Sequence, residues 1–144
     1  MRNRYETFTV LMSKITRDIR RLKADAMREF KLKVPHFSCI YYLYTAGALT
    51  AKELCDKCDE DKSGVSRSLD FLEKDGYIVC DVTAGKRYKS LLRLTEKGKA
   101  IGEIINNRIK EVIDKASLGL SEAEIVSLYR WLVIISDNLK KLGD

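Results

Sequence analysis

The stretch LTAKELCDKCDEDKSGVSR, residues 49–67, decides the fold of this chain. It begins with a capping box, in which Thr50 accepts a hydrogen bond from an orphan backbone N–H and Glu53 reaches back. A short helix over 51–58 follows, and the acidic residues after it supply a cap for a second helix over 62–75. Two helices joined by a tight turn are typical of a helix-turn-helix.

The hydrophobic period changes after Gly76, which ends the second of these helices. Residues 77–82 alternate like a strand, 83–89 form a turn with a basic tip, and 90–94 form the returning strand. A hairpin that directly follows a helix-turn-helix has the position of a wing. The sequence therefore predicts a winged helix-turn-helix head over 34–95.

Amphipathic helices flank this head on both sides. Apolar residues recur at spacings of three and four along the first helix: Phe8, Met12, Ile15, Ile19 and Leu22. A second helix begins near Pro35, and Thr95 and Ser121 cap two more with the same apolar spacing. We therefore expect a mainly α fold with a small β-hairpin wing, in which the head rests on a helical dimerisation body formed by 1–33 and 96–144.

Length and composition fit one domain over 1–144, because 45% of the residues are apolar. No apolar run reaches the roughly 18 residues that a membrane span needs, and the N-terminus lacks a signal-like block. We therefore expect a cytoplasmic protein that does not contact a membrane. The net charge of +6 comes from 1–33, with ten Lys/Arg against four Asp/Glu, so net charge alone does not identify a nucleic-acid partner.

The start of the helix over 62–75 carries groups suited to DNA. Ser63, Ser66 and Arg67 share one face, because they are three or four residues apart. Arginine binds the O6 and N7 of guanine with two hydrogen bonds, and serine reaches bases or phosphates. Lys62 adds a charge at the helix N-terminus, which itself attracts phosphate. The alternative is a merely solvated polar face, but the neighbouring capped helix and basic hairpin favour DNA.

The hairpin tip adds Lys86, Arg87 and Lys89, a basic group suited to a narrow minor groove. Basic tips also serve solubility, which is the alternative. We include Thr50, at the start of the short helix, among the expected DNA contacts. The chain has one histidine and no glycine-rich phosphate loop, so we expect no catalytic residues, no cofactor and no enzyme activity.

Four motifs in order resemble the MarR family of bacterial transcription regulators: residues 49–54, 61–67, 72–78 and 92–98. The resemblance covers nearly the whole chain. It implies a homodimer built from the terminal helices, with the helix over 62–75 in the major groove and the hairpin in the minor groove of double-stranded DNA. It implies a pseudo-palindromic operator and a repressor that a small-molecule effector or an oxidant releases.

Two positions depart from the family pattern. The family's wing usually carries Asp-x-Arg, whereas this chain has Lys86-Arg87-Tyr88, so the acid is missing and Tyr88 replaces the arginine. Gly64 occupies the first turn of the recognition helix, where glycine costs up to ~1 kcal/mol relative to alanine. This glycine either permits close approach of the backbone to DNA or loosens the turn.

The four cysteines are Cys39, Cys55, Cys58 and Cys80. In a reducing compartment we expect all four to be free thiols. Cys55-x-x-Cys58 lacks the second pair that a structural zinc site needs, so we expect no metal. A thiol-based redox regulator remains an alternative, although the family's sensor cysteine lies in the first helix, which has none here.

A ligand pocket could include His36, Tyr41 and Tyr44. The alternatives are a surface histidine at the start of a helix and tyrosines that pack in the core. A second alternative concerns the whole chain, which could be a winged-helix protein–protein module without DNA binding. The basic hairpin and the Ser/Arg face argue against that module.

Overall fold

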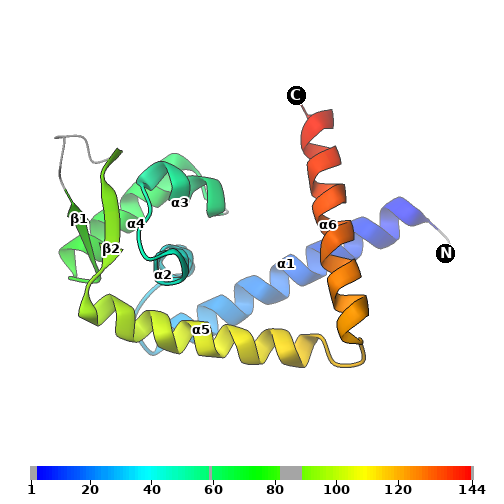
Figure 1. The fold of residues 1–144 in the computed structure, drawn as a ribbon, viewed down its shortest axis with the longest axis horizontal. Helices are drawn as coiled ribbons and strands as arrows, with labels where there is room; N and C mark the ends of the chain where they lie inside the picture. Colours follow the sequence, from blue (N-terminus) through cyan, green and yellow to red (C-terminus); the bar gives the residue numbers. More distant parts are fainter. Residues whose placement is uncertain (1–2, 59, 82–88, 144) are drawn as a thin grey trace. The chain divides into compact units, whose positions relative to one another are not determined.

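The computed structural model describes residues 3–58, 60–81 and 89–143. Its elements in chain order (Figure 1) are α1 (Arg4–Arg28), α2 (Val34–Ala46), α3 (Ala51–Lys57), α4 (Lys62–Lys74), β1 (Ile78–Asp81), β2 (Leu91–Leu94), α5 (Glu96–Ala116) and α6 (Glu122–Leu142). This confirms a mainly α chain with a small hairpin. The chain divides into two compact units, 1–108 and 109–144. Within the described ranges, no helix combines the length and apolar character that crossing a membrane requires.

The expected caps are present. Thr50 Oγ1 accepts a hydrogen bond from the Glu53 N–H at 3.2 Å, while Glu53 Oε2 accepts one from the Thr50 N–H at 3.0 Å. Asp61 Oδ1 accepts a bond of 2.6 Å from the Gly64 N–H. Ser121 begins α6 with the same reciprocal pair of bonds as Thr50. Short-range sequence signals therefore set where α3, α4 and α6 begin.

The core of residues 1–108 joins apolar side chains from every helix of this unit and from β2. Its most deeply buried large side chains are Met27, Ile40, Leu43, Leu54, Leu69, Leu72, Leu92 and Ile105. Full burial of one such side chain contributes about 1.5–3 kcal/mol. The buried side chains of Leu69 and Leu72 keep one face of α4 in the core, so the opposite face of the helix is exposed to solvent.

Two helices leave apolar side chains exposed. On α1, the side chains of Ile15, Ile19 and Leu22 remain between 40% and 49% exposed. No residue of α6 is buried. Its large exposed apolar residues include Leu128, Trp131, Ile135, Leu139 and Leu142. Contiguous exposed apolar surfaces of this kind are rare on stable monomers. We therefore expect a partner surface to cover the exposed apolar residues of both helices.

His36 is not a surface residue, as its place at a helix start suggested, because only 8% of it is exposed. Its ring stacks on Phe71 of α4, with centroids 4.4 Å apart and planes 8° from parallel. Its Nδ1 accepts a hydrogen bond of 3.0 Å from the Lys33 N–H. Burial, helped by the charge of Lys33, lowers the pKa of His36, while Asp75 opposes the shift. His36 therefore links the start of α2 to α4 in its neutral form.

This burial predicts a pH dependence of stability. The folded pKa of His36 lies below its ordinary value of 6.5, so the unfolded chain gains a proton there first as the pH falls. The free energy of unfolding should therefore be fully retained above pH 6.5 and decrease below it. Denaturant unfolding at pH 7.5 and 5.5 measures the change. His36→Gln should flatten it, because the chain has one histidine. A slope that persists in the variant would contradict this assignment.

Candidate nucleic-acid interface

Buried side chains anchor helices α3 and α4 in the core. Leu54 of α3 is fully buried, and Val65 of α4 is 2% exposed. Cys58 ends α3 and Asp61 caps α4, so the turn between the helices is short. Buried side chains on both helices and a capped junction give α4 a defined orientation within this unit.

The structure brings the predicted recognition residues together on the solvent side of α4. Ser63, Ser66 and Arg67 are exposed, and Lys62 is exposed at the helix start. Thr50 lies half-buried at the start of α3, with its hydroxyl oxygen accepting the capping bond. Its O–H hydrogen can still be donated to a phosphate. The arrangement presents two hydroxyls and a guanidinium beside a helix N-terminus, which suits both base edges and phosphates.

The structure gives a reason for glycine at position 64 that the sequence did not reveal. A Cβ at this position would lie 2.9 Å from Asp61 Oδ1 and 3.1 Å from Glu60 Oε2. The same Asp61 oxygen accepts the capping bond from the Gly64 N–H. The glycine therefore leaves room for the cap that starts the recognition helix.

An ion pair joins the two strands of the hairpin. Arg93 Nε on β2 lies 2.7 Å from Asp81 Oδ2 on β1, and both side chains are about half exposed. Such a pair contributes little to stability, but it holds the guanidinium against its partner strand. Lys89 is exposed just before β2. The expected contacts Lys86 and Arg87 lie outside the described residues.

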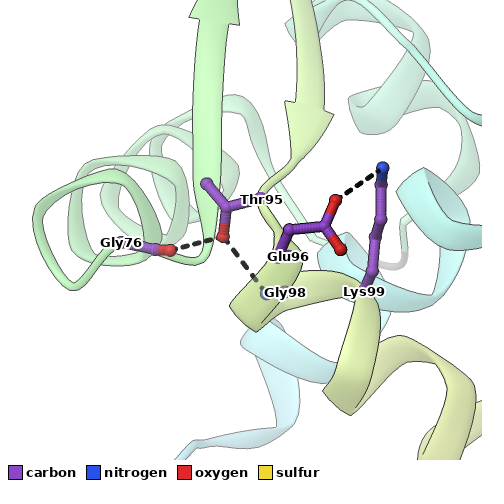
Figure 2. A network of polar contacts seen from close by, with 5 residues as sticks. All are labelled: Gly76, Thr95, Glu96, Gly98 and Lys99. Carbon is purple, nitrogen blue, oxygen red and sulfur yellow. Dashed lines mark hydrogen bonds and ion pairs between the residues drawn. The ribbon is translucent and has the colours of Figure 1, made fainter.

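Thr95 fastens the end of α4 to the start of α5 (Figure 2). Its hydroxyl donates a hydrogen bond of 2.5 Å to the Gly76 carbonyl and accepts one of 3.2 Å from the Gly98 N–H. Its own N–H donates to the Tyr77 carbonyl at 3.0 Å. The sequence predicted only a helix cap here. The same residue also joins the recognition helix to α5 and the hairpin.

The structure describes all three residues expected to line a ligand pocket. His36 stacks on α4, and Tyr41 packs against the rings of Phe37 and Tyr42. A surface cavity of about 500 Å³ is lined by Tyr44 but by neither of the other two. Its remaining walls are Leu43, Ala46, Gly47, Ala48, Arg93, Leu94 and Lys99.

The two cysteines of the Cys55-x-x-Cys58 motif differ in backbone conformation and burial. Cys58 stands at the end of α3 with extended backbone, at φ −83° and ψ 143°, so it lies outside the helix that contains Cys55. Cys58 and Cys39 of α2 are both buried, and their interaction lowers the pKa of Cys58 and raises the pKa of Cys39. Within the described ranges, no three His, Cys, Asp or Glu residues form a group that could hold a metal ion.

A family model described as "MarR family" matches residues 30–87, from the segment after α1 to a point between β1 and β2. Over this segment, which is less than half of the chain, the sequence is similar to the MarR family. Helix α4, which the sequence predicts to contact DNA, lies wholly inside the matched segment.

Curated proteins and solved structures are also similar to this chain. An uncharacterized HTH-type transcriptional regulator of Bacillus cereus is 32% identical over 88 residues, which span 60% of this chain and 57% of that relative. The structure of a MarR family regulator from Neisseria meningitidis superposes with a TM-score of 0.84 at 24% identity, covering 97% of this chain and 96% of that one. A putative MarR family regulator from Listeria monocytogenes, complexed with 26mer DNA, gives 0.82 at 24% identity, covering 96% and 90%. The fold is therefore similar over nearly the whole chain.

Proposed function

We propose that this chain is a homodimeric, sequence-specific DNA-binding transcription regulator. The observation that carries the proposal is the exposed N-terminal face of α4, where Ser63, Ser66 and Arg67 lie together. Leu69 and Leu72 hold the opposite face in the core. A helix anchored on one face, with a guanidinium and hydroxyls on the other, can enter a major groove and contact base edges.

The other expected contacts have mainly positioning roles. Lys62 and Thr50 lie beside helix N-termini, where phosphates bind, and Lys89 adds a charge at the hairpin. We assign Lys86 and Arg87 to the minor groove on their sequence positions. The structurally similar regulator from Listeria monocytogenes was crystallised with 26mer DNA, which supports DNA as the partner in this proposal.

The exposed apolar stripes support a second copy of the chain as partner. In this proposal 34–95 form the DNA-binding head, and 1–33 with 96–144 form the dimerisation body. A two-fold axis then places two copies of α4 on half-sites about one helical turn apart. The regulator would act in the cytoplasm, where bacterial DNA lies, and the proposal includes no catalytic step.

Dimerisation gives a direct prediction. Sedimentation at low micromolar concentration should show twice the chain mass of 16.5 kDa. Leu139→Glu places a charge among the exposed apolar residues of α6 and should shift the equilibrium towards monomer, because a charge loses hydration in a dry interface. Lys141→Glu, elsewhere on the same helix, should not. A wild-type species of 16.5 kDa would contradict the dimer.

Selection from random duplex DNA tests the function. The purified full chain should enrich a pseudo-palindrome, and its affinity for that duplex should fall steeply with salt, because phosphate contacts release counterions. Absence of retained DNA at low salt would overturn the proposal and favour a protein–protein module.

We extend the proposal to release by a small ligand. The cavity beside Tyr44 supports this, since its wall combines the apolar side chains of Leu43 and Leu94 with the charged groups of Arg93 and Lys99. A compound screen for release of the selected operator tests it. Tyr44→Ala should keep operator affinity and lose the response to any compound that binds this cavity. Release that is unchanged in the variant would place the ligand elsewhere.

A further inference from the structure

A small cavity of about 160 Å³ joins three parts of the head and α1. Four residues of α1, two of α2 and Glu60, which directly precedes the cap of α4, line it. It shares no lining residue with the larger cavity beside Tyr44. Its volume corresponds to on the order of five water molecules, so any ligand that fits inside is small.

Ser38 supplies a buried hydroxyl to the α2 wall of this cavity. Only 8% of the residue is exposed, and its hydroxyl has no hydrogen-bond partner among the residues that the structure describes. In the described ranges, every side-chain nitrogen or oxygen that is sealed from solvent does have a partner. The Ser38 hydroxyl therefore opens onto the cavity that the residue lines, where a ligand can satisfy it.

Charges of both signs line the same cavity. The Lys23 ammonium lies 5.5 Å from the centroid of the Phe37 ring, which holds it against α2. Neither Lys23 nor Glu60 belongs to an ion pair within residues 3–58, 60–81 and 89–143. Arg20 adds a second positive charge but already interacts with another group. A ligand with both a carboxylate and an ammonium matches these walls, whereas Glu60 would repel a simple anion.

We propose that this cavity binds a small zwitterion, an α-amino acid of about the size of valine. The carboxylate of the ligand pairs with the Lys23 ammonium and accepts a hydrogen bond from the Ser38 hydroxyl, while its ammonium pairs with Glu60. The apolar side chain of the ligand packs on Ile19 and Val34. An α-amino acid carries both charges on adjacent groups, as a cavity of this size requires. Binding here does not depend on DNA.

Calorimetric titration of the full chain with L-valine tests this site. Two probes of matched shape each lack one charge: 3-methylbutanoate has no ammonium, and 2-methylpropylamine has no carboxylate. We expect L-valine to bind about tenfold or more tightly than either probe, because each probe loses a charge-assisted hydrogen bond. Inorganic phosphate should also bind more weakly than L-valine, because Glu60 repels it. No L-valine binding at millimolar concentration, or equal or tighter binding of 3-methylbutanoate or phosphate, would overturn the proposal.

Three variants locate the site. Glu60→Gln should lower the affinity for L-valine about tenfold without lowering the affinity for 3-methylbutanoate, which has no ammonium. Ser38→Ala should weaken binding of both molecules, because both carry the carboxylate, and urea unfolding checks that this variant is folded. Glu103→Gln, on an exposed position of α5, is the matched control and should bind L-valine like wild type. L-valine binding that is unchanged in Glu60→Gln would place the ligand elsewhere and overturn the proposal, whether or not the chain binds DNA.

Discussion

Gly98→Ala is expected to lower the free energy of unfolding by about 1–3 kcal/mol or more, although alanine is the better helix former by up to ~1 kcal/mol. A Cβ on Gly98 would overlap the Tyr77 carbonyl oxygen and lie 3.0 Å from Leu94 Cδ2. The Tyr77 oxygen cannot move aside freely, because it accepts the hydrogen bond from the Thr95 N–H. Backbone must therefore shift where α4, the hairpin and α5 meet.

Two further glycines provide graded controls. A Cβ on Gly102 would lie 2.7 Å from Tyr44 Cδ2, so Gly102→Ala pushes on a side chain and should cost less than Gly98→Ala. At Gly143 the nearest atom would be 3.6 Å away, so Gly143→Ala should be close to neutral. Urea unfolding followed by circular dichroism measures all three variants. A Gly98→Ala protein more stable than wild type would show that helix propensity outweighs the close contact.

Most of the fold could be predicted because its signals are local. Thr50, Asp61 and Ser121 each cap a helix through a residue three positions away, so the spacing that forms the bonds is visible in the sequence. The alternation of strand residues and the amphipathic spacing of the helices are equally local. The order of elements follows from these signals, and the exposed face of α4 follows from the position of Val65, Leu69 and Leu72.

The sequence analysis missed contacts between residues that lie far apart in the chain, because local patterns do not encode them. His36 looked like a surface residue because its partner, Phe71, lies 35 positions away on α4. Cys58 was grouped with Cys55 by spacing, whereas Cys39, on another helix, lowers the pKa of Cys58. The sequence predicted Thr95 as a helix cap, but its hydrogen bond to Gly76 depends on where the returning strand of the hairpin places it. In each case the missing information was which elements pack together.

The recognition helix gives the second large effect. Arg67→Ala is expected to reduce the ratio of operator affinity to random-DNA affinity, because a lost bidentate base contact costs about 1–3 kcal/mol of discrimination. A dimer carries two copies, so the loss counts twice, at about 2–6 kcal/mol. Lys89→Ala is the matched control, since it removes an exposed charge from the hairpin. It should weaken both affinities alike and reduce the salt slope by about one unit per contact.

The two variants should differ in the ratio of operator affinity to random-DNA affinity, so comparing them tests whether Arg67 contacts bases. Arg67 lies on the exposed face of a helix whose opposite face is buried, so its removal should leave the fold of α4 intact. Any change in the affinity ratio then reports the loss of a base contact. The measurement is affinity for operator and random duplexes over a salt series, with unfolding curves as the control for stability. If Arg67→Ala behaves like Lys89→Ala, with parallel losses and an unchanged ratio, then Arg67 contacts phosphate, and direct readout must come from Ser63 and Ser66 or from the shape of the DNA.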